Sequence, residues 1–131
     1  MFCCSMTGEK LKPFVIGKSA QPRCFRNVNL AALGVTWQSN RKAWTNSELF
    51  EEWLRNVDSD MKRQDRKMLL FMDNAPCHPN LSDCLSNVKL QFFPPNTTSK
   101  LQPLDQGIIK NVKHKTAQNC FCTSSVRWMI A

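Results

Sequence analysis

The sequence has no long apolar run. Its longest uncharged apolar stretch is Met68–Met72, and a membrane-spanning helix needs about 20 such residues, so none is expected. Residues 1–16 also lack the basic start, apolar stretch and small-residue cleavage site of a signal peptide, so an intracellular location is expected. The seven cysteines form an odd, irregularly spaced set, as expected of reduced thiols rather than of a secreted disulfide framework.

Internal repeats and low-complexity tracts are absent as well. The chain has 131 residues, with 4 glycines, 7 prolines and 42% hydrophobic residues, which excludes collagen-like, fibrous and fully disordered proteins. A chain of this length buries roughly two-thirds of the surface of its unfolded form. The length therefore predicts one domain with a core of its own.

Acidic residues are few and unevenly placed. There are 10 of them against 18 lysines and arginines, which gives a formal net charge of +8. Residues 1–44 and residues 100–131 are basic, with Glu9 and Asp105 as their only acids, and the middle of the chain is slightly acidic. Two basic zones suit a polyanion such as DNA, because each phosphate neutralised releases counterions. A basic surface that only keeps the protein soluble is the alternative.

The first half of the chain predicts strands followed by a helix. Apolar stretches on both sides of Gly8 suggest a β-hairpin, and residues 33–38 suggest a third strand. Thr45 and Glu48 fit a capping box, in which both side chains bond to orphan amides at a helix start. Apolar residues then recur at steps of three and four and predict one buried face: Leu49, Phe50, Trp53, Leu54, Val57 and Met61. Three tryptophans are expected in the core rather than on a base-stacking surface: Trp37, Trp44 and Trp53.

The second half predicts alternating strands and helices. Residues 68–72 are continuously apolar and too few for a helix, which predicts a buried central strand. A short helix over residues 79–86, a strand over 88–93 and an extended loop over 94–98 follow. The last helix is expected from Leu104 to about residue 118, with one apolar and one basic face. This order of elements is typical of an α/β fold.

Two aspartates stand where chemistry is expected. Asp73 closes the strand over residues 68–72, and ligands collect outside the carboxyl ends of strands in open α/β sheets. Its alternative is an ordinary turn aspartate. Asp105 opens the last helix and shares a face with Ile108 and Ile109, which aims its carboxylate at the sheet; an ordinary N-cap is the alternative. Two carboxylates suit a hard cation such as Mg²⁺, but a full site needs a third acid.

His78 lies just beyond the end of the same strand. Its position suits a residue that orients a ligand or contacts phosphate, although a loop histidine bonded to the backbone is more common. Cys77, His78 and Cys84 do not have the spacing of zinc ligands. Adjacent Cys77 and His78 side chains point apart, which argues against a nucleophilic pair.

Three strings stand in order along the chain: Leu69-Leu70-Phe71-Met72-Asp73-Asn74-Ala75-Pro76-Cys77-His78-Pro79, Phe93-Pro94-Pro95-Asn96-Thr97-Thr98-Ser99 and Leu101-Gln102-Pro103-Leu104-Asp105-Gln106-Gly107-Ile108-Ile109. Together they resemble the catalytic domain of DDE superfamily endonucleases of the pogo and Tigger type, the group that also gave rise to jerky-like and centromere-protein-B-like host proteins. The resemblance extends over residues 3–116.

The resemblance implies an RNase H-like fold, a mixed α/β sheet flanked by helices. It also implies cleavage and joining of DNA strands that depends on Mg²⁺ or Mn²⁺ and on three metal-binding acids. Asp73 matches the second acid and Asp105 the third, with Asn74 and His78 as supporting neighbours. The first acid lies in the family upstream of the stretch that resembles Phe2 to Met6, so the first strand and its acid are expected to be missing.

The matches predict a partial DDE endonuclease domain over residues 1–118 and a divergent tail over residues 119–131. The expected protein is a transposon-derived, catalytically incomplete fragment that binds DNA in the nucleus without sequence readout. Its DNA-binding residues are expected to be Lys100, Lys110, Lys113 and Lys115. One alternative is an active Mg²⁺-dependent strand-transfer nuclease in a longer native product, or one completed by a second copy or another chain. The other is a domesticated, non-catalytic nuclear DNA-binding protein.

Overall fold

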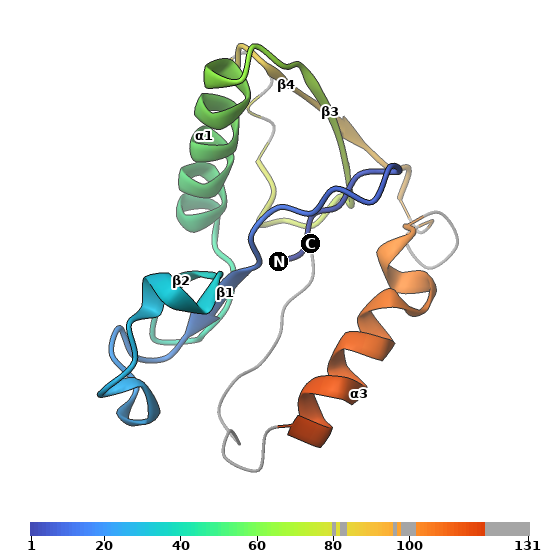
Figure 1. Ribbon diagram of the computed structural model, residues 1–131. Coiled ribbons are helices and arrows are strands. Elements are labelled where there is room, and N and C mark those ends of the chain that lie inside the picture. Colours follow the sequence, from blue (N-terminus) through green and yellow to red (C-terminus); the bar gives the residue numbers. More distant parts are fainter. Residues whose placement is uncertain (80, 82–83, 96, 98–101, 120–131) are drawn as a thin grey trace. The chain divides into compact units, whose positions relative to one another are not determined.

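The computed structural model describes residues 1–79, 81, 84–95, 97 and 102–119 (Figure 1). The chain divides into two compact units, one of Met1–Trp44 with Lys113–Ala131 and one of Thr45–Val112. Each unit contains a pair of parallel strands, and helices accompany them, so the expected α/β class is confirmed. In the described part of the chain, no helix is both long enough and apolar enough to cross a membrane.

The first unit begins with a reversal of the chain around Gly8. This glycine has a φ of +88°, a backbone conformation that a side chain disfavours. The predicted hairpin is present as an antiparallel bridge between Cys4 and Lys10. Farther from the turn, the amide of Phe14 donates to the carbonyl of Met1 over 3.0 Å. The reversal is therefore as expected, but the regular strand is short.

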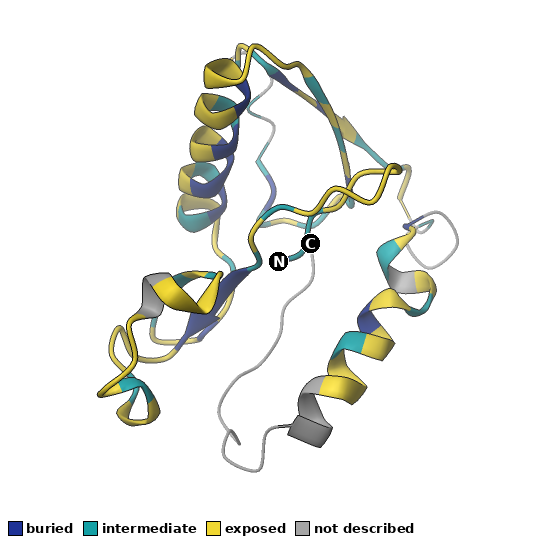
Figure 2. Ribbon diagram, in the orientation of Figure 1, coloured by how far each residue is buried: buried dark blue, intermediate teal, exposed yellow. Residues whose placement is uncertain are grey.

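That strand, β1 (Phe14–Gly17), pairs in parallel with β2 (Thr36–Ser39). All four residues of β1 are buried, as the dark blue arrow in Figure 2 shows. The predicted third strand starts later than expected, because Leu30–Leu33 forms a 3₁₀ turn. A second 3₁₀ turn, Arg23–Phe25, lies in the same crossover between the two parallel strands.

The second unit begins with helix α1 (Ser47–Arg63). Its N-cap is Asn46, whose side-chain oxygen accepts from the amide of Leu49 over 3.1 Å, so the predicted cap at Thr45 is wrong by one residue. The predicted apolar face is confirmed, and its buried members lie along one side of the helix in Figure 2: Phe50, Trp53, Leu54, Val57 and Met61. Trp44, in contrast, is 49% exposed and Trp37 is half-buried, so the core location expected for these two is not found.

Strands β3 (Met68–Met72) and β4 (Val88–Phe92) form a parallel pair with Met68 opposite Val88. The bounds of β3 agree with the sequence prediction, and β4 ends one residue before the predicted residue 93. The predicted burial of β3 on both faces is wrong. Met72 is buried, whereas Leu69 and Phe71 are 52% and 55% exposed. Helix α1 contacts β4, and alternate residues of β3 are exposed.

The last helix starts later than the sequence predicts. Leu104–Ile108 is a wide helical turn, and the regular helix α3 spans Ile109–Asn119. Gly107 has a φ of +109°, which breaks the helical path between the two segments. The short helix expected over residues 79–86 and the loop expected over residues 94–98 lie partly outside the described residues.

Candidate metal and nucleic-acid site

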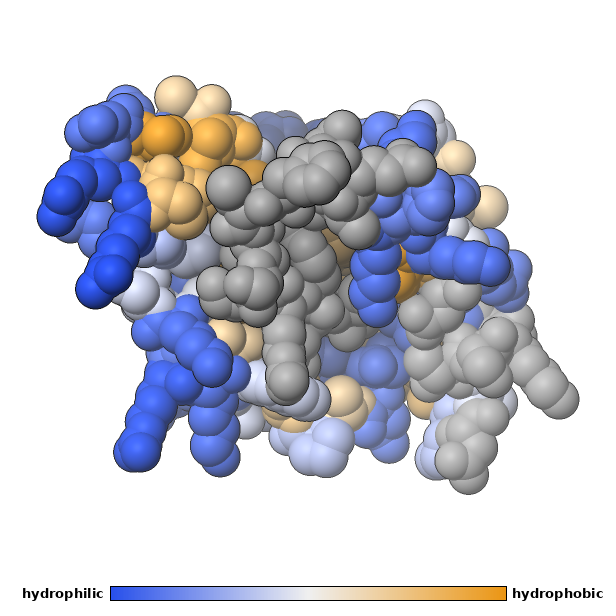
Figure 3. Space-filling view, turned by 90° about the horizontal axis from the view of Figure 1, so that it is seen from below, coloured by the Kyte–Doolittle hydropathy of each residue, from blue (hydrophilic) through white to orange (hydrophobic). Residues whose placement is uncertain are grey.

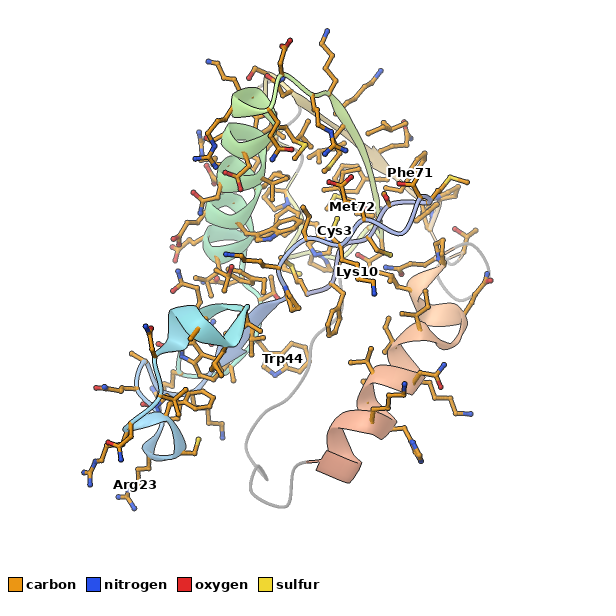
Figure 4. The ribbon with its side chains drawn as sticks, in the orientation of Figure 1. Cys3, Lys10, Arg23, Trp44, Phe71 and Met72 are labelled. Carbon is orange, nitrogen blue, oxygen red and sulfur yellow. The ribbon has the colours of Figure 1, made fainter. Side chains whose placement is uncertain are left out.

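Asp73 lies directly after β3, at the carboxyl end where the sequence predicts a ligand site. Figure 4 marks Met72, the residue before it, at the end of this strand. The Oδ1 atom of Asp73 is buried and lies 2.9 Å from Nδ1 of His78. The same ring nitrogen is aligned with the main-chain oxygen of Asp73, 3.4 Å away, rather than with the carboxylate. The carboxylate oxygen is therefore buried beside the ring without an aligned donor among the described residues.

His78 is held in place from two sides. It is buried, and its ring lies 4.4 Å, centroid to centroid, from the ring of Phe50 in α1. Its amide donates to the carbonyl of Ala75 over 2.9 Å, which closes the turn after β3. The helix thus supports the loop that carries Asp73 through an aromatic contact. Phe50 has no place among the predicted site residues, although its position on the apolar face of α1 is the signal that could have suggested it.

The neighbours of Asp73 in the loop differ in exposure. Asn74 is exposed, and Cys77 is half-buried. Burial raises the pKa of the Cys77 thiol, and the charge of Asp73 raises it further, while a main-chain hydrogen bond opposes the shift. A thiol held protonated is a poor nucleophile. The loop therefore offers carboxylate and amide oxygens rather than a reactive sulfur.

Asp105 lies within the wide turn Leu104–Ile108, and its side chain is outside the described part of the structure. Asp105 is expected to share a helical face with Ile108 and Ile109, but the backbone of Gln106 and Gly107 between them is not helical, so the register on which this expectation depends is interrupted. The structure thus does not test the approach of Asp105 to Asp73. Among the residues that the structure describes, no group of three histidines, cysteines or acids is placed to hold a metal ion.

A second buried oxygen belongs to the same string as Asp105. Gln102 is 5% exposed, and its Oε1 atom has no hydrogen-bond donor among the described residues. The prediction of site residues did not include Gln102. Its only signal in the sequence is its place between Leu101 and Pro103, three residues before Asp105.

The structure describes three of the four predicted DNA-binding lysines. Lys110, Lys113 and Lys115 lie on α3 and are exposed. Lys110 and Lys113 are three residues apart, so they lie on the same side of the helix. Lys100 lies outside the described residues.

The comparisons with known proteins agree on one family. The profile of the DDE superfamily endonucleases matches residues 1–125. The chain is 36% identical over 107 residues to Tigger transposable element-derived protein 4 of Mus musculus, covering 82% of this chain and 20% of that protein. It is 35% identical over 121 residues to ARS-binding protein 1 of Schizosaccharomyces pombe (85% and 23%). It is 32% identical over 114 residues to major centromere autoantigen B of Homo sapiens (86% and 18%). The chain thus spans about a fifth of the length of these relatives. No solved structure matches it.

Proposed function

Because the chain belongs to the DDE superfamily endonucleases, we propose that it is a transposon-derived piece of such a domain that binds DNA in the nucleus. The match of the superfamily profile over residues 1–125 is the observation that carries the proposal. The names of the relatives support it, because one is derived from a transposable element, one binds ARS and one is a centromere antigen. Its fold is RNase H-like over residues 1–118, with a divergent tail over residues 119–131.

Asp73 and Asp105 are proposed to hold Mg²⁺ or Mn²⁺. A buried carboxylate oxygen without an aligned donor fits a hard cation, which prefers oxygen ligands. When bound, such an ion supplies charge stabilisation for phosphodiester chemistry. His78 supports the loop that carries Asp73, with its Nδ1 2.9 Å from the carboxylate oxygen, and Asn74 offers an exposed amide next to Asp73.

The 131 residues are proposed to be catalytically incomplete. The family strings supply two of three metal-binding acids, Asp73 and Asp105. An active nuclease then requires the first acid from a longer native product, from a second copy or from another chain. A non-catalytic, domesticated DNA-binding protein is the other outcome, and it requires no third acid.

Metal binding is tested by thermal unfolding with and without Mn²⁺. We expect the ion to raise the melting temperature of the wild type, because it binds only the folded state, and to leave Asp73→Asn unchanged. Asp65→Asn is the matched control: Asp65 is exposed and has a φ of +51°, which asparagine tolerates. If Mn²⁺ does not change the melting temperature of the wild type, the metal-binding part of the proposal is wrong.

Catalytic incompleteness is tested by incubating the chain with a transposon-end duplex and Mg²⁺. We expect no cleavage. Turnover that Asp73→Asn abolishes and Asp65→Asn preserves would show that the chain is an active nuclease.

DNA binding through α3 is tested by titrating a labelled duplex with the full chain. Replacement of Lys110, Lys113 and Lys115 with glutamine removes three exposed charges from one helix. We expect weaker binding and a smaller loss of affinity with salt, since each lysine that contacts a phosphate contributes a slope of about 0.9 in log K against log salt. Unchanged affinity and slope assign DNA binding to another part of the chain.

A further inference from the structure

We propose that residues 1–44 carry a second DNA-binding surface, in addition to the lysines of α3, that binds the phosphates of duplex DNA. This five-base surface consists of Lys18, Arg23, Arg26, Arg41 and Lys42. It rests on the proposed function only in the choice of DNA as the partner. Its placement follows from the topology of β1 and β2.

The two parallel strands bring their carboxyl ends to one edge. Gly17, the last residue of β1, is opposite Ser39, the last residue of β2, and the amide of Asn40 donates to the carbonyl of Gly17 over 3.0 Å. Lys18 follows Gly17 directly, and Arg41 follows Asn40. The bases that leave the two strands thus start from the same place, although they are more than twenty residues apart in the sequence.

Trp37 anchors the first of the two basic segments. Its Nε1 donates to the carbonyl of Ser19 over 3.3 Å. Its ring meets Phe25 edge-to-face, with centroids 5.2 Å apart and planes at 86°. Phe25 lies between Arg23 and Arg26 in a 3₁₀ turn, so the aromatic contact fixes the turn that presents both arginines. In Figure 4 the Arg23 side chain extends away from the ribbon at the tip of this segment.

Asn40 closes the second basic segment. Its side-chain oxygen accepts from the amide of Trp44 over 3.1 Å, and its Nδ2 donates to the carbonyl of Trp44 over 2.5 Å. Between them, Ala43 is buried with a φ of +52°. Arg41 and Lys42 are exposed in this tight loop. A loop held at both ends loses less conformational entropy when its bases bind a ligand.

The five bases of this surface are not neutralised by acidic side chains of the described residues. All five bases are exposed, and none of them forms an ion pair with another described residue. No acid occurs in the sequence between Glu9 and Glu48. Figure 3 shows long hydrophilic side chains, in blue, on the left of that view.

The chemistry of these bases fits a phosphate backbone. A guanidinium offers a planar fork of donors that matches phosphate oxygens, and a lysine adds a point charge. Five cations without acids on two fixed loops suit a regularly charged polyanion, whose neutralised phosphates release counterions. An acidic protein and an anionic lipid surface are the alternative partners, and the test distinguishes them from DNA.

The test compares two triple variants of the full chain in titrations of a labelled duplex. The first, called the five-base variant after its surface, is Lys18→Gln/Arg23→Gln/Arg26→Gln and removes three of the five charges of that surface. The second, the control, is Lys62→Gln/Lys67→Gln/Lys89→Gln and removes three exposed charges from the other unit. Three lost phosphate contacts reduce the slope of log K against log salt by about 2.7. From about 50 mM to about 200 mM salt, the wild type and the control should therefore lose about 40-fold more affinity than the five-base variant.

The second segment gives an independent variant, Arg41→Gln/Lys42→Gln, for which we expect a slope reduced by about 1.8. Thermal unfolding of the variants checks that they fold. We expect unchanged melting temperatures, because all altered side chains are exposed. Equal losses in the five-base variant and its control overturn the proposal, because net charge then explains both.

The same titrations separate this surface from the proposed function. If the α3 lysine variant loses binding while the five-base variant keeps it, the five-base surface fails and DNA binding stands. If the wild type binds anionic phosphatidylserine vesicles but no duplex, both proposals of DNA binding fail and the bases serve a lipid surface. Binding of an acidic polypeptide in preference to the duplex likewise overturns the five-base surface as a DNA site.

Discussion

The carboxylate of Asp58 joins α1 to the start of β4. It accepts hydrogen bonds from the amides of Ser86, Asn87 and Val88 at 3.3, 2.7 and 2.8 Å, and from the Ser86 hydroxyl at 3.1 Å. These partners are 28 to 30 residues away in the sequence. A single side chain therefore satisfies three consecutive main-chain donors that precede and open a strand.

Replacement of Asp58 with alanine should lower the free energy of unfolding by about 1–3 kcal/mol, because the amides lose a charged acceptor. Urea unfolding followed by circular dichroism measures this change. Asp60→Ala is the matched control, since Asp60 pairs with Arg63 at the exposed surface of the same helix, and surface pairs contribute at most about 1 kcal/mol. Equal effects of the two substitutions would contradict a special role for Asp58.

The contribution of Asp58 should also depend on pH. Burial raises the pKa of its carboxyl, but the hydrogen bonds from Asn87, Ser86 and Val88 outweigh burial, and the pKa lies below the ordinary value of 3.8. A lowered pKa in the folded state means that the stabilisation is complete above pH 3.8 and is lost as the pH falls through the folded-state pKa. Urea midpoints of the wild type and Asp58→Ala should therefore converge below pH 3.8. A difference that stays constant at low pH would refute this assignment.

At the scale of elements, Asn46 and Thr45 are the two candidate N-caps of α1. Asn46 bonds to the amide of Leu49, and its backbone is extended, with φ −116° and ψ 169°. Asn46→Ala should lower the free energy of unfolding by about 1 kcal/mol, because the helix loses its capping acceptor. Thr45→Ala should have a smaller effect. Thermal unfolding of both variants decides between the caps, and a larger loss for Thr45→Ala would restore the capping box predicted from the sequence.

The β1–β2 pair leaves no room for a side chain at Gly17. A Cβ atom there would lie 2.3 Å from Cζ2 of Trp37. Gly17→Ala should therefore lower the free energy of unfolding by about 1–3 kcal/mol through overpacking. The same substitution in a Trp37→Ala background should cost less, because the obstructing ring is gone. Equal costs in the two backgrounds would show that the ring is not the obstacle.

At the scale of the whole molecule, the net charge of +8 predicts binding to DNA without sequence readout. Duplexes of equal length and composition but scrambled sequence should bind the full chain with closely similar affinities at one salt concentration. Competition titrations with labelled duplexes measure this. A preference of about 10³-fold or more for one sequence is typical of specific recognition and would contradict the prediction.

The periodic parts of the chain were predictable from the sequence. The apolar face of α1, the bounds of β3 and nearly those of β4, and the position of Asp73 after β3 all depend on residues close together in the chain. The family strings identified the superfamily for the same reason, since they are local patterns. Local spacing therefore determined which segments are helix or strand, and where a carboxylate stands at the end of one.

Only the tertiary structure decided which predicted features face water and which residues meet. The exposure of Phe71, the contact of His78 with Phe50 and the amide partners of Asp58 depend on contacts between distant segments, which local patterns do not encode. Gln106 and Gly107 are a further case, because their non-helical backbone interrupts the helix between Asp105 and α3. The sequence by itself determined family, elements and charge, and contacts between distant segments decided burial and the pairing that brings the ends of β1 and β2 together.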